Sequence, residues 1–266
     1  MRQRILVGLL AIPVILIPVW LGGVWIALLL AAVAIAGALE FYRLIELGGF
    51  HPNRLLGLLW LIPLVLNGWR PQFFPLSLVL AAGMIITLVE ALFRKEQPIS
   101  SWMATAMPAL YLGIMVGQSV ALRMLPDGLW WLLLAFFVTW GNDTFAYFSG
   151  VSLGRHRLWP RISPKKTWEG TIIGWLGAAA VGAGMVAITP LSASYSVWFG
   201  MGLGLCCGVL ALLGDLSISI LKRQVGVKDS GRFFPGHGGM LDRMDSPLFV
   251  LPFVYQMVLL WARVAG

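Results

Sequence analysis

The chain has 266 residues, of which 59% are hydrophobic and 11% charged, and its mean hydropathy is +0.86. Soluble domains carry about 25% charged residues, so this composition excludes an ordinary soluble globule and, more firmly, a disordered chain. The 19 Lys and Arg residues exceed the 11 Asp and Glu residues, for a net charge of +8. Because these cations lie between apolar segments, we interpret them as topology signals and as partners of anionic lipids or phosphates, not of nucleic acid.

Nine apolar stretches bounded by charges or turn residues predict membrane-spanning helices. The expected fold class is therefore an all-α, polytopic integral membrane helical bundle, because helices satisfy their own backbone polar groups in lipid. Eight spans is the alternative, with the first run re-entrant. In chain order the stretches cover about residues 5–21, 24–39, 55–69, 73–93, 102–125, 129–151, 170–189, 196–221 and 247–264.

The distribution of cations predicts the orientation. Loops after the even-numbered spans contain 14 of the 19 Lys and Arg residues. By the positive-inside rule, these loops lie on the cytoplasmic side of a bacterial-type inner membrane. Arg2 and Arg4 would then lie outside, against the local preference of the rule. We divide the chain into N-terminal transmembrane helices, residues 1–100, and a C-terminal catalytic transmembrane region, residues 101–266, with cytoplasmic loops at 152–169 and 222–246.

Two acids interrupt the apolar stretches. Asp143 has apolar residues on both sides, and an acid at bilayer depth usually faces a polar cavity because its insertion costs about 2.5 to 3.5 kcal/mol. Asp215, Ser219 and Lys222 follow the spacing i, i+4 and i+7, which places an acid, a hydroxyl and a cation on one helix face. A structural salt bridge between Asp215 and a nearby lysine is an alternative explanation for part of this stripe. By contrast, Cys206 and Cys207 are adjacent in an apolar run and are interpreted as small packing residues.

The loop from Lys222 to Pro247 combines five cations, three acids, one histidine and five glycines. Interspersed charges of both signs are expected where a metal and several phosphates are held together. Carboxylates such as Asp215 and Asp242 are hard oxygen ligands suited to Mg²⁺, and the scarcity of cysteine and histidine disfavours zinc. His237 is a candidate base or phosphate donor, or else a histidine packed in a glycine turn. Ser246 and Pro247 predict the start of the last helix.

The other polar loop ends in the sequence ISPKKTWEG, residues 162–170. Ser163 and Pro164 predict a helix N-cap and first helical position, with Lys165 and Lys166 in the first turn. Cations there oppose the helix dipole, and a bound anion would relieve the conflict. Alternatively, both lysines anchor the chain near lipid phosphates. The sequence contains no GxxxxGK[ST] phosphate loop and no GxSxG elbow.

The residues from Ser219 to Asp245 resemble the C-terminal signature of phosphatidate cytidylyltransferases, also called CDP-diacylglycerol synthases. The run from Asp143 through SPKKTWEG is similar to a second stretch of that family. The matching signature positions are Ser219, Lys222, Arg223, Lys228, Asp229, Pro235, His237, Gly238, Gly239, Asp242, Arg243 and Asp245.

This resemblance implies that CTP and phosphatidic acid react to give CDP-diacylglycerol and pyrophosphate for phospholipid biosynthesis, with Mg²⁺ as cofactor and the question of a second cation left open. It also implies a homodimer as a reasonable expectation. Asp215 and Asp242 would hold the metal. The expected catalytic residues are Asp215, Asp242, Lys222, Arg223 and His237. The expected substrate-binding residues are Asp143, Ser163, Lys165, Lys166, Thr167, Glu169, Ser219, Lys228, Asp229, Gly238, Gly239, Arg243 and Asp245.

Two alternatives remain at this point. A CTP-dependent polyprenol or dolichol kinase would release CDP, whereas a cytidylyltransferase releases pyrophosphate. A transporter for an anionic solute would also use intramembrane acids and broken helices, although the sequence shows no internal repeat. A CDP-alcohol phosphatidyltransferase is disfavoured because its acid cluster is absent.

Overall fold

The computed structural model describes residues 14–231, 233 and 238–265. The chain divides into two compact units that each combine distant segments. Unit 1 comprises Met1–Met124 and Gln224–Met244, and unit 2 comprises Leu125–Arg223 and Asp245–Gly266. This division rests on contacts within the structure. The division after residue 100 instead separates the N-terminal helices from the region expected to be catalytic, and it stays a prediction.

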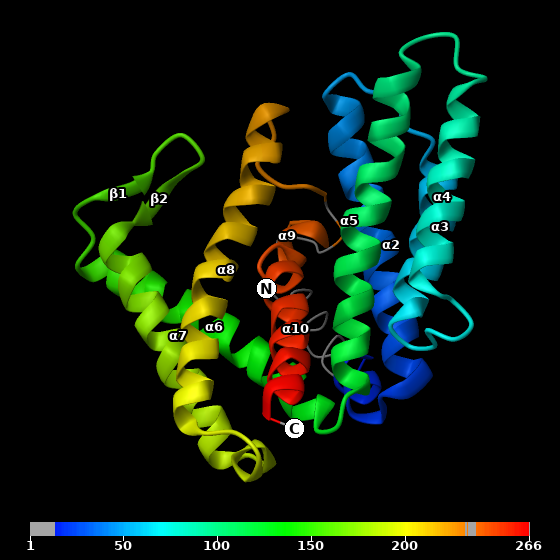
Figure 1. Cartoon of the computed structure of the whole chain (residues 1–266). Coiled ribbons are helices and arrows are strands. Elements are labelled where there is room, and N and C mark those ends of the chain that lie inside the picture. The colour runs from blue at the N-terminus through cyan, green and yellow to red at the C-terminus, as the bar shows by residue number, and fades with distance from the viewer. Residues whose placement is uncertain (1–13, 232, 234–237, 266) are drawn as a thin grey trace. The chain divides into compact units, whose positions relative to one another are not determined.

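Unit 1 is a bundle of antiparallel helices that lie side by side in Figure 1. The buried side chains of α2 and α3 pack on α5, and the Tyr42 hydroxyl donates a hydrogen bond to the Thr105 carbonyl at 2.8 Å. Residues 14–21 are also helical. The other helices of this unit are α2 (Gly23–Leu47), α3 (Arg54–Asn67), α4 (Leu76–Ala91), α5 (Pro98–Met124) and the single turn α9 (Leu241–Met244).

Polar contacts show which connections between helices lie at each of the two ends of unit 1. At one end, the Arg123 guanidinium donates to the Val19 and Trp20 carbonyls, at 2.8 Å each, and so holds the turn at Gly22 beside the end of α5. At the other end, Asn53 caps α3 and its amide Nδ2 donates to Glu90 Oε1 at 3.1 Å. The loops that follow α2 and α4 therefore share one end, as the alternating topology requires.

Unit 2 packs three long helices closely and adds a short hairpin. Its helices are α6 (Gly128–Ser152), α7 (Trp168–Ile188), α8 (Val197–Gln224) and α10 (Pro247–Ala265), with a 3-10 turn η1 (Pro190–Ala193) before α8. Strands β1 (Arg157–Trp159) and β2 (Ser163–Thr167) form an antiparallel pair between α6 and α7.

Small residues let the helices of unit 2 approach each other at backbone distance. A Cβ atom added at Gly204 of α8 would collide with the Ala178 carbonyl of α7, and one added at Gly182 of α7 would collide with the Gly200 carbonyl. Without a hydrophobic driving force between helices in lipid, such close packing is a main source of their association. At one end of the unit, Trp131 lies edge-on to Tyr195, with ring centroids 4.7 Å apart.

Each of the nine predicted stretches coincides with helix, the first over residues 14–21 and the rest over α2 to α8 and α10. Five described helices are long and apolar enough to cross a membrane: Gly23–Leu47, Pro98–Met124, Trp168–Ile188, Val197–Gln224 and the segment Leu241–Val264. Two shorter apolar helices are α3 and α4. The helical membrane class is thus confirmed, whereas the number of spans stays a prediction.

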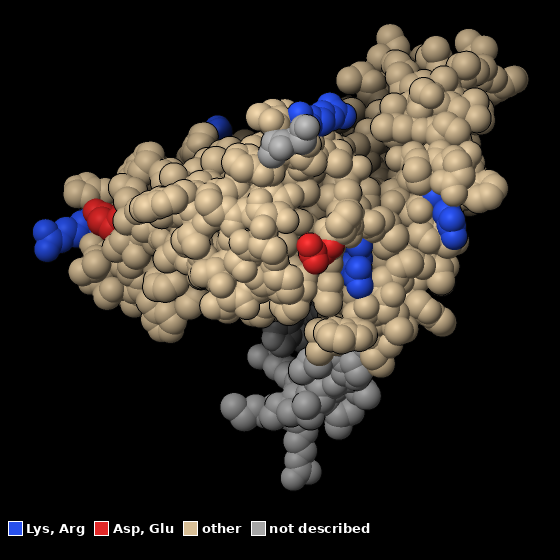
Figure 2. Space-filling view, turned by 60° about the horizontal axis from the view of Figure 1, so that its bottom comes forward, with Lys and Arg blue, Asp and Glu red and all other residues tan. Residues whose placement is uncertain are grey.

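The surface agrees with a lipid environment. Large apolar side chains such as Phe93 and Ile188 are about four-fifths exposed, at 82% and 81%. Figure 2 shows that charged side chains are few and scattered on the face drawn there. Of the two adjacent cysteines on α8, Cys207 is buried as expected of a packing residue, but Cys206 is exposed, so the packing interpretation was wrong for Cys206.

Candidate functional site

The center of the site in unit 2 is an ion pair between the hairpin and α8. Lys166 Nζ lies 2.5 Å from Asp215 Oδ2, and the two side chains are only 29% and 30% exposed. A half-buried pair keeps both charges in place at a modest cost in desolvation. The salt bridge considered from the sequence therefore exists, and it joins the two polar segments that the sequence singled out.

Around this pair, α8 presents the predicted polar stripe. The helix is continuous through Asp215, Ser219 and Lys222, and the Ser219 hydroxyl donates to Asp215 Oδ1 at 3.3 Å. Lys222 is buried, at 7% exposure, and its ammonium interacts electrostatically with the Asp215 carboxylate. The helical spacing i, i+4 and i+7 is thus confirmed as one face.

Two further acids meet this face. Asp245, just before α10, lies close enough to Asp215 for the two carboxylates to interact electrostatically, and it accepts the Ser246 amide at 2.7 Å. Asp143 of α6 is exposed, accepts a hydrogen bond from Asn142 Nδ2 at 3.2 Å, and interacts electrostatically with Lys166 and Asp215. We call the five residues Asp143, Lys166, Asp215, Lys222 and Asp245 the acid–lysine cluster.

The hairpin corrects one prediction. Ser163 and Pro164 do not begin a helix: residues Ser163–Thr167 form β2, in which Ser163 pairs with Trp159. Helix α7 begins at Trp168, where the Thr167 hydroxyl accepts the Gly170 amide at 3.2 Å. The sequence signal failed because Ser-Pro and Thr-Trp both match a helix start, and the pairing with β1 decides between them.

The strand has a consequence for the two lysines. Successive side chains of a strand point to opposite faces, so Lys165 is exposed whereas Lys166 is half-buried against Asp215. The expected conflict between two lysines and a helix dipole does not arise, because neither residue lies in α7.

Other predicted residues of unit 2 tie the hairpin to the helices. Glu169 Oε1 lies 2.7 Å from His156 Nδ1, and its carboxylate also accepts the Arg155 and His156 amides at 3.2 to 3.3 Å. The Arg223 Nε donates to the Ile162 carbonyl at 3.4 Å. Glu169 and Arg223 thus hold the hairpin region against α7 and α8. Their predicted roles in catalysis and substrate binding stay predictions.

In unit 1, the loop between α8 and α9, residues 225–240, is called here the glycine-rich loop. Asp242 Oδ2 accepts three hydrogen bonds from its described parts: from the Ser230 amide at 2.9 Å, the Ser230 hydroxyl at 3.0 Å and the Gly239 amide at 2.9 Å. Gly238 has φ of 84°, a conformation that favours glycine. Lys228, Asp229 and Arg243 are exposed.

The structure therefore assembles the predicted residues in two groups. Asp143, Lys166, Ser219, Lys222 and Asp245 converge on Asp215 in unit 2, while Asp242 organises the loop in unit 1. The joint metal ligation by Asp215 and Asp242 stays a prediction, and His237 lies outside the described residues. Helix α10 begins at Pro247 as predicted; Asp242 lies in α9, whereas Asp245 lies in the break between α9 and α10.

Sequence reasoning missed three contributors. Asn142 is buried beside Asp143, Ser230 is buried at 2% exposure, and the Glu40 carboxylate of α2 accepts hydrogen bonds from the glycine-rich loop and α9. The signal that identified Asp143 and Asp215, an acid within an apolar helix, also applies to Glu40. It was overlooked because the predicted span stopped at residue 39, whereas α2 continues to Leu47.

The donor set of the acid–lysine cluster can be compared with the needs of a metal ion. Within the described ranges, no group of three or more His, Cys, Asp or Glu side chains is close enough to hold a metal by itself. Two carboxylates, Asp215 and Asp245, do meet. Mg²⁺ binds through one or two carboxylates together with waters and substrate phosphates, so the pair fits Mg²⁺ and does not fit a zinc site.

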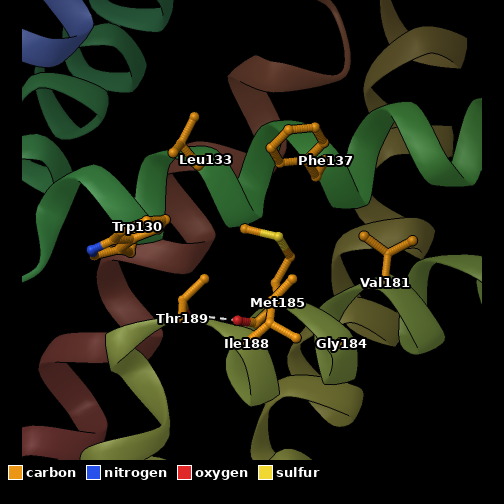
Figure 3. A pocket seen from close by; sticks show the side chains of 8 residues that line it. All are labelled: Trp130, Leu133, Phe137, Val181, Gly184, Met185, Ile188 and Thr189. Carbon is orange, nitrogen blue, oxygen red and sulfur yellow. Dashed lines mark hydrogen bonds between the residues drawn. The ribbon is translucent and has the colours of Figure 1, made fainter.

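A cavity in unit 2 has a different chemistry. It measures about 490 Å³ and lies between α6 and α7. Figure 3 shows Trp130, Leu133 and Phe137 on one side and Val181 and Met185 on the other. Its lining contains no charged residue and none of the predicted site residues. It can accept an apolar chain, but it cannot neutralise phosphates.

Comparison with known proteins identifies similar sequences. A model of the cytidylyltransferase family matches residues 2–261. A phosphatidate cytidylyltransferase of Bacillus subtilis (strain 168) is 34% identical over 98% of this chain and 99% of the relative. Relatives with the same name from Staphylococcus haemolyticus (strain JCSC1435) and Brucella abortus biovar 1 (strain 9-941) are 36% and 34% identical. The first alignment covers 85% of each chain, and the second covers 82% of this chain and 80% of the relative.

Proposed function

The chain belongs to the cytidylyltransferase family, and we propose that its acid–lysine cluster and glycine-rich loop carry out the reaction of that family. The chain is a phosphatidate cytidylyltransferase: CTP and phosphatidate give CDP-diacylglycerol and pyrophosphate. The observation that carries the assignment of the site is the ion pair between Lys166 and Asp215. It joins Lys166, in one segment that resembles the family, to Asp215, which lies four residues before the other, Ser219–Asp245, in a chain with only 11% charged residues.

The chemistry explains why these residue types are needed. A phosphate oxygen of phosphatidate attacks the α-phosphorus of CTP, the new P–O bond forms, and the bond to the β-phosphate breaks as pyrophosphate leaves. Such reactions depend on positioning and on neutralising negative charge, with little covalent work for side chains. Lys166 and Lys222 supply positive charge beside Asp215, and the half-buried setting strengthens their effect relative to bulk water.

Mg²⁺ is proposed as the cofactor, held by Asp215 and Asp242, with Asp245 as an additional carboxylate beside Asp215. When bound, it would neutralise phosphate oxygens and stabilise the departing pyrophosphate. The electrostatic proximity of Asp215 and Asp245 supports this proposal, because like charges repel unless a proton or a cation lies between them. Lys166 forms an ion pair with Asp215, and Lys222 adds a second positive charge beside it.

The site is proposed to open toward the cytoplasm, where CTP is found. Support comes from charge: Arg54, at the start of α3, and Lys95, after α4, lie at one end of unit 1, whereas Arg123 lies at the other. The connections at that end follow α2 and α4, which are even-numbered spans in the nine-span topology that we propose. A homodimer in the membrane is part of the same proposal, and it rests on the family resemblance alone.

A pyrophosphate-release assay tests the proposal. Purified protein in detergent receives phosphatidate and each of the four nucleoside triphosphates in turn, with Mg²⁺. Release of pyrophosphate with CTP, and formation of CDP-diacylglycerol, are expected. Release of CDP with phosphorylation of a polyprenol would instead indicate a kinase, and uptake of an unchanged anionic solute into proteoliposomes would indicate a transporter.

A further inference from the structure

We propose that Glu40, on transmembrane helix α2, is a positioning residue that anchors the glycine-rich loop and thereby orients Asp242. The proposal rests on the proposed function of Asp242 in the reaction. Glu40 Oε1 accepts a hydrogen bond from the Met240 amide at 3.0 Å, and Oε2 accepts the Leu241 amide at 2.9 Å. One carboxylate thus binds two consecutive backbone amides about 200 residues away in the sequence.

The same carboxylate reaches Asp242 through one intermediate. The Ser230 hydroxyl lies 2.8 Å from Glu40 Oε2 and 3.0 Å from Asp242 Oδ2. Ser230 is buried at 2% exposure, and its single hydroxyl proton can be donated to either of these two acids, one at a time. The Ser230 amide donates to Asp242 as well, at 2.9 Å. Displacement of Ser230 would therefore displace Asp242.

Two described glycines of the loop lie against Glu40. A Cβ atom added at Gly231 or at Gly239 would collide with the Glu40 carboxylate, and one at Gly239 would also meet the Ser230 hydroxyl. Only glycine lets the backbone approach the carboxylate this closely. Two glycines that both leave room for one carboxylate are not explained by a Glu40 that only faces solvent near the end of α2.

The chemistry of the contacts requires a carboxylate of this length. Hydrogen bonds from amides to an ionised acceptor are about twice as strong as neutral ones. Glutamine has the same size but offers only one acceptor oxygen, and its NH₂ group would face an N–H donor. Aspartate keeps the charge but is one methylene shorter, so it cannot bind both amides and Ser230 from the same backbone position.

The test compares Glu40→Gln and Glu40→Asp with wild type in full-length protein in detergent. The control is Glu46→Gln, which lies on the same helix and removes the partner of the exposed Arg54. Substitution of a residue that orients a metal ligand typically costs about 10- to 100-fold. Both Glu40 variants are expected to lose kcat by this factor and to need more Mg²⁺ for half-maximal rate, whereas Glu46→Gln retains wild-type values.

Hydrogen exchange provides a readout that is independent of activity. The Met240 and Leu241 amides should exchange about tenfold faster or more in Glu40→Gln than in Glu46→Gln, while the thermal midpoints of the two variants stay within a few degrees of each other. Unchanged exchange at these amides, or full activity of Glu40→Gln, overturns the proposal. Full activity of Glu40→Asp with loss in Glu40→Gln also overturns it, because charge alone would then suffice. If wild type forms no CDP-diacylglycerol, the proposed function fails, and the exchange data still decide the anchoring role.

Discussion

Lys166 and Asp215 form an ion pair of 2.5 Å between a strand and the interior of a transmembrane helix. Asp215 lies nine residues before the end of α8, which is about 13 Å along the helix axis. Strand β2 thus brings Lys166 to Asp215, which lies in the interior of α8 and not at its end. Each charge depends on the other, and this dependence makes the pair a sensitive target for substitution.

Replacement of Lys166 by Met should reduce kcat by about 100- to 1000-fold, the usual cost of removing one charge-stabilising group from an active site. Lys166→Arg should retain part of the activity, because its charge persists but its shape differs. Pyrophosphate release measures both variants. The control is Lys95→Met in an exposed loop of unit 1, and an equal loss in that control would contradict a specific role of Lys166.

Metal removal should abolish the reaction. After treatment with a chelator, no CDP-diacylglycerol should form, and added Mg²⁺ should restore the rate because two carboxylates meet at Asp215 and Asp245. Zn²⁺ should not replace it, since the described part of the site offers no cysteine or histidine set. In Asp215→Asn, the Mg²⁺ concentration for half-maximal rate should rise. Turnover in the presence of excess chelator would refute the metal assignment.

Asp242→Asn should abolish turnover while the protein stays folded. Asp242 Oδ2 accepts three hydrogen bonds, and asparagine keeps the shape but loses the charge. The matched control is Asp127→Asn, at the start of α6, where φ of 55° suits asparagine. Activity and gel-filtration profile should be measured together. A fully active Asp242→Asn variant would remove this residue from the metal site.

Two glycines of α8 should respond differently to replacement by alanine. At Gly204 the new Cβ would collide with the Ala178 carbonyl, whereas at Gly202 nothing lies within 4 Å. Gly204→Ala should therefore destabilise the protein by about 1 to 3 kcal/mol, and Gly202→Ala should be neutral or slightly stabilising because alanine favours helix. Thermal unfolding in detergent compares the two. Equal midpoints would show that α7 and α8 are not in backbone contact.

The start of α7 can be tested by removal of hydroxyls. Thr167→Ala should destabilise the protein by about 1 kcal/mol, the usual value of an N-cap, because Thr167 accepts the Gly170 amide. Thr167→Ser should retain the stability. Ser163→Ala should change it little, since Ser163 lies in β2. The reverse order of thermal midpoints would restore the helix start predicted at Ser163.

The acids show how far the sequence could be interpreted. Asp143 and Asp215 stand out because an acid in an apolar run is costly unless it meets a polar partner. Helical periodicity then predicts correctly that Ser219 and Lys222 share the face of Asp215. Periodicity describes one helix at a time, however, and so it could not identify Lys166 as the partner or show that Lys165 points away.

Glu40 illustrates the opposite case. Its position at the end of an apolar run resembles that of an ordinary polar helix end, and nothing near it in sequence predicts a contact with Met240 or Ser230. The sequence shows the glycines at 231 and 239, but it does not show that they make room for the Glu40 carboxylate. Such contacts join segments far apart in the chain, and a single sequence has no signal for them.

The sequence by itself determined that the chain is a helical membrane protein. Its apolar stretches are long and contain few charges, and in lipid such stretches form helices because helices satisfy their own backbone polar groups. It also predicted which residue types would handle phosphate. The tertiary structure alone decided which acid meets which cation, where α7 begins and what anchors the glycine-rich loop. These outcomes depend on strand pairing and on helix packing through small residues, and both join residues that are distant in the sequence.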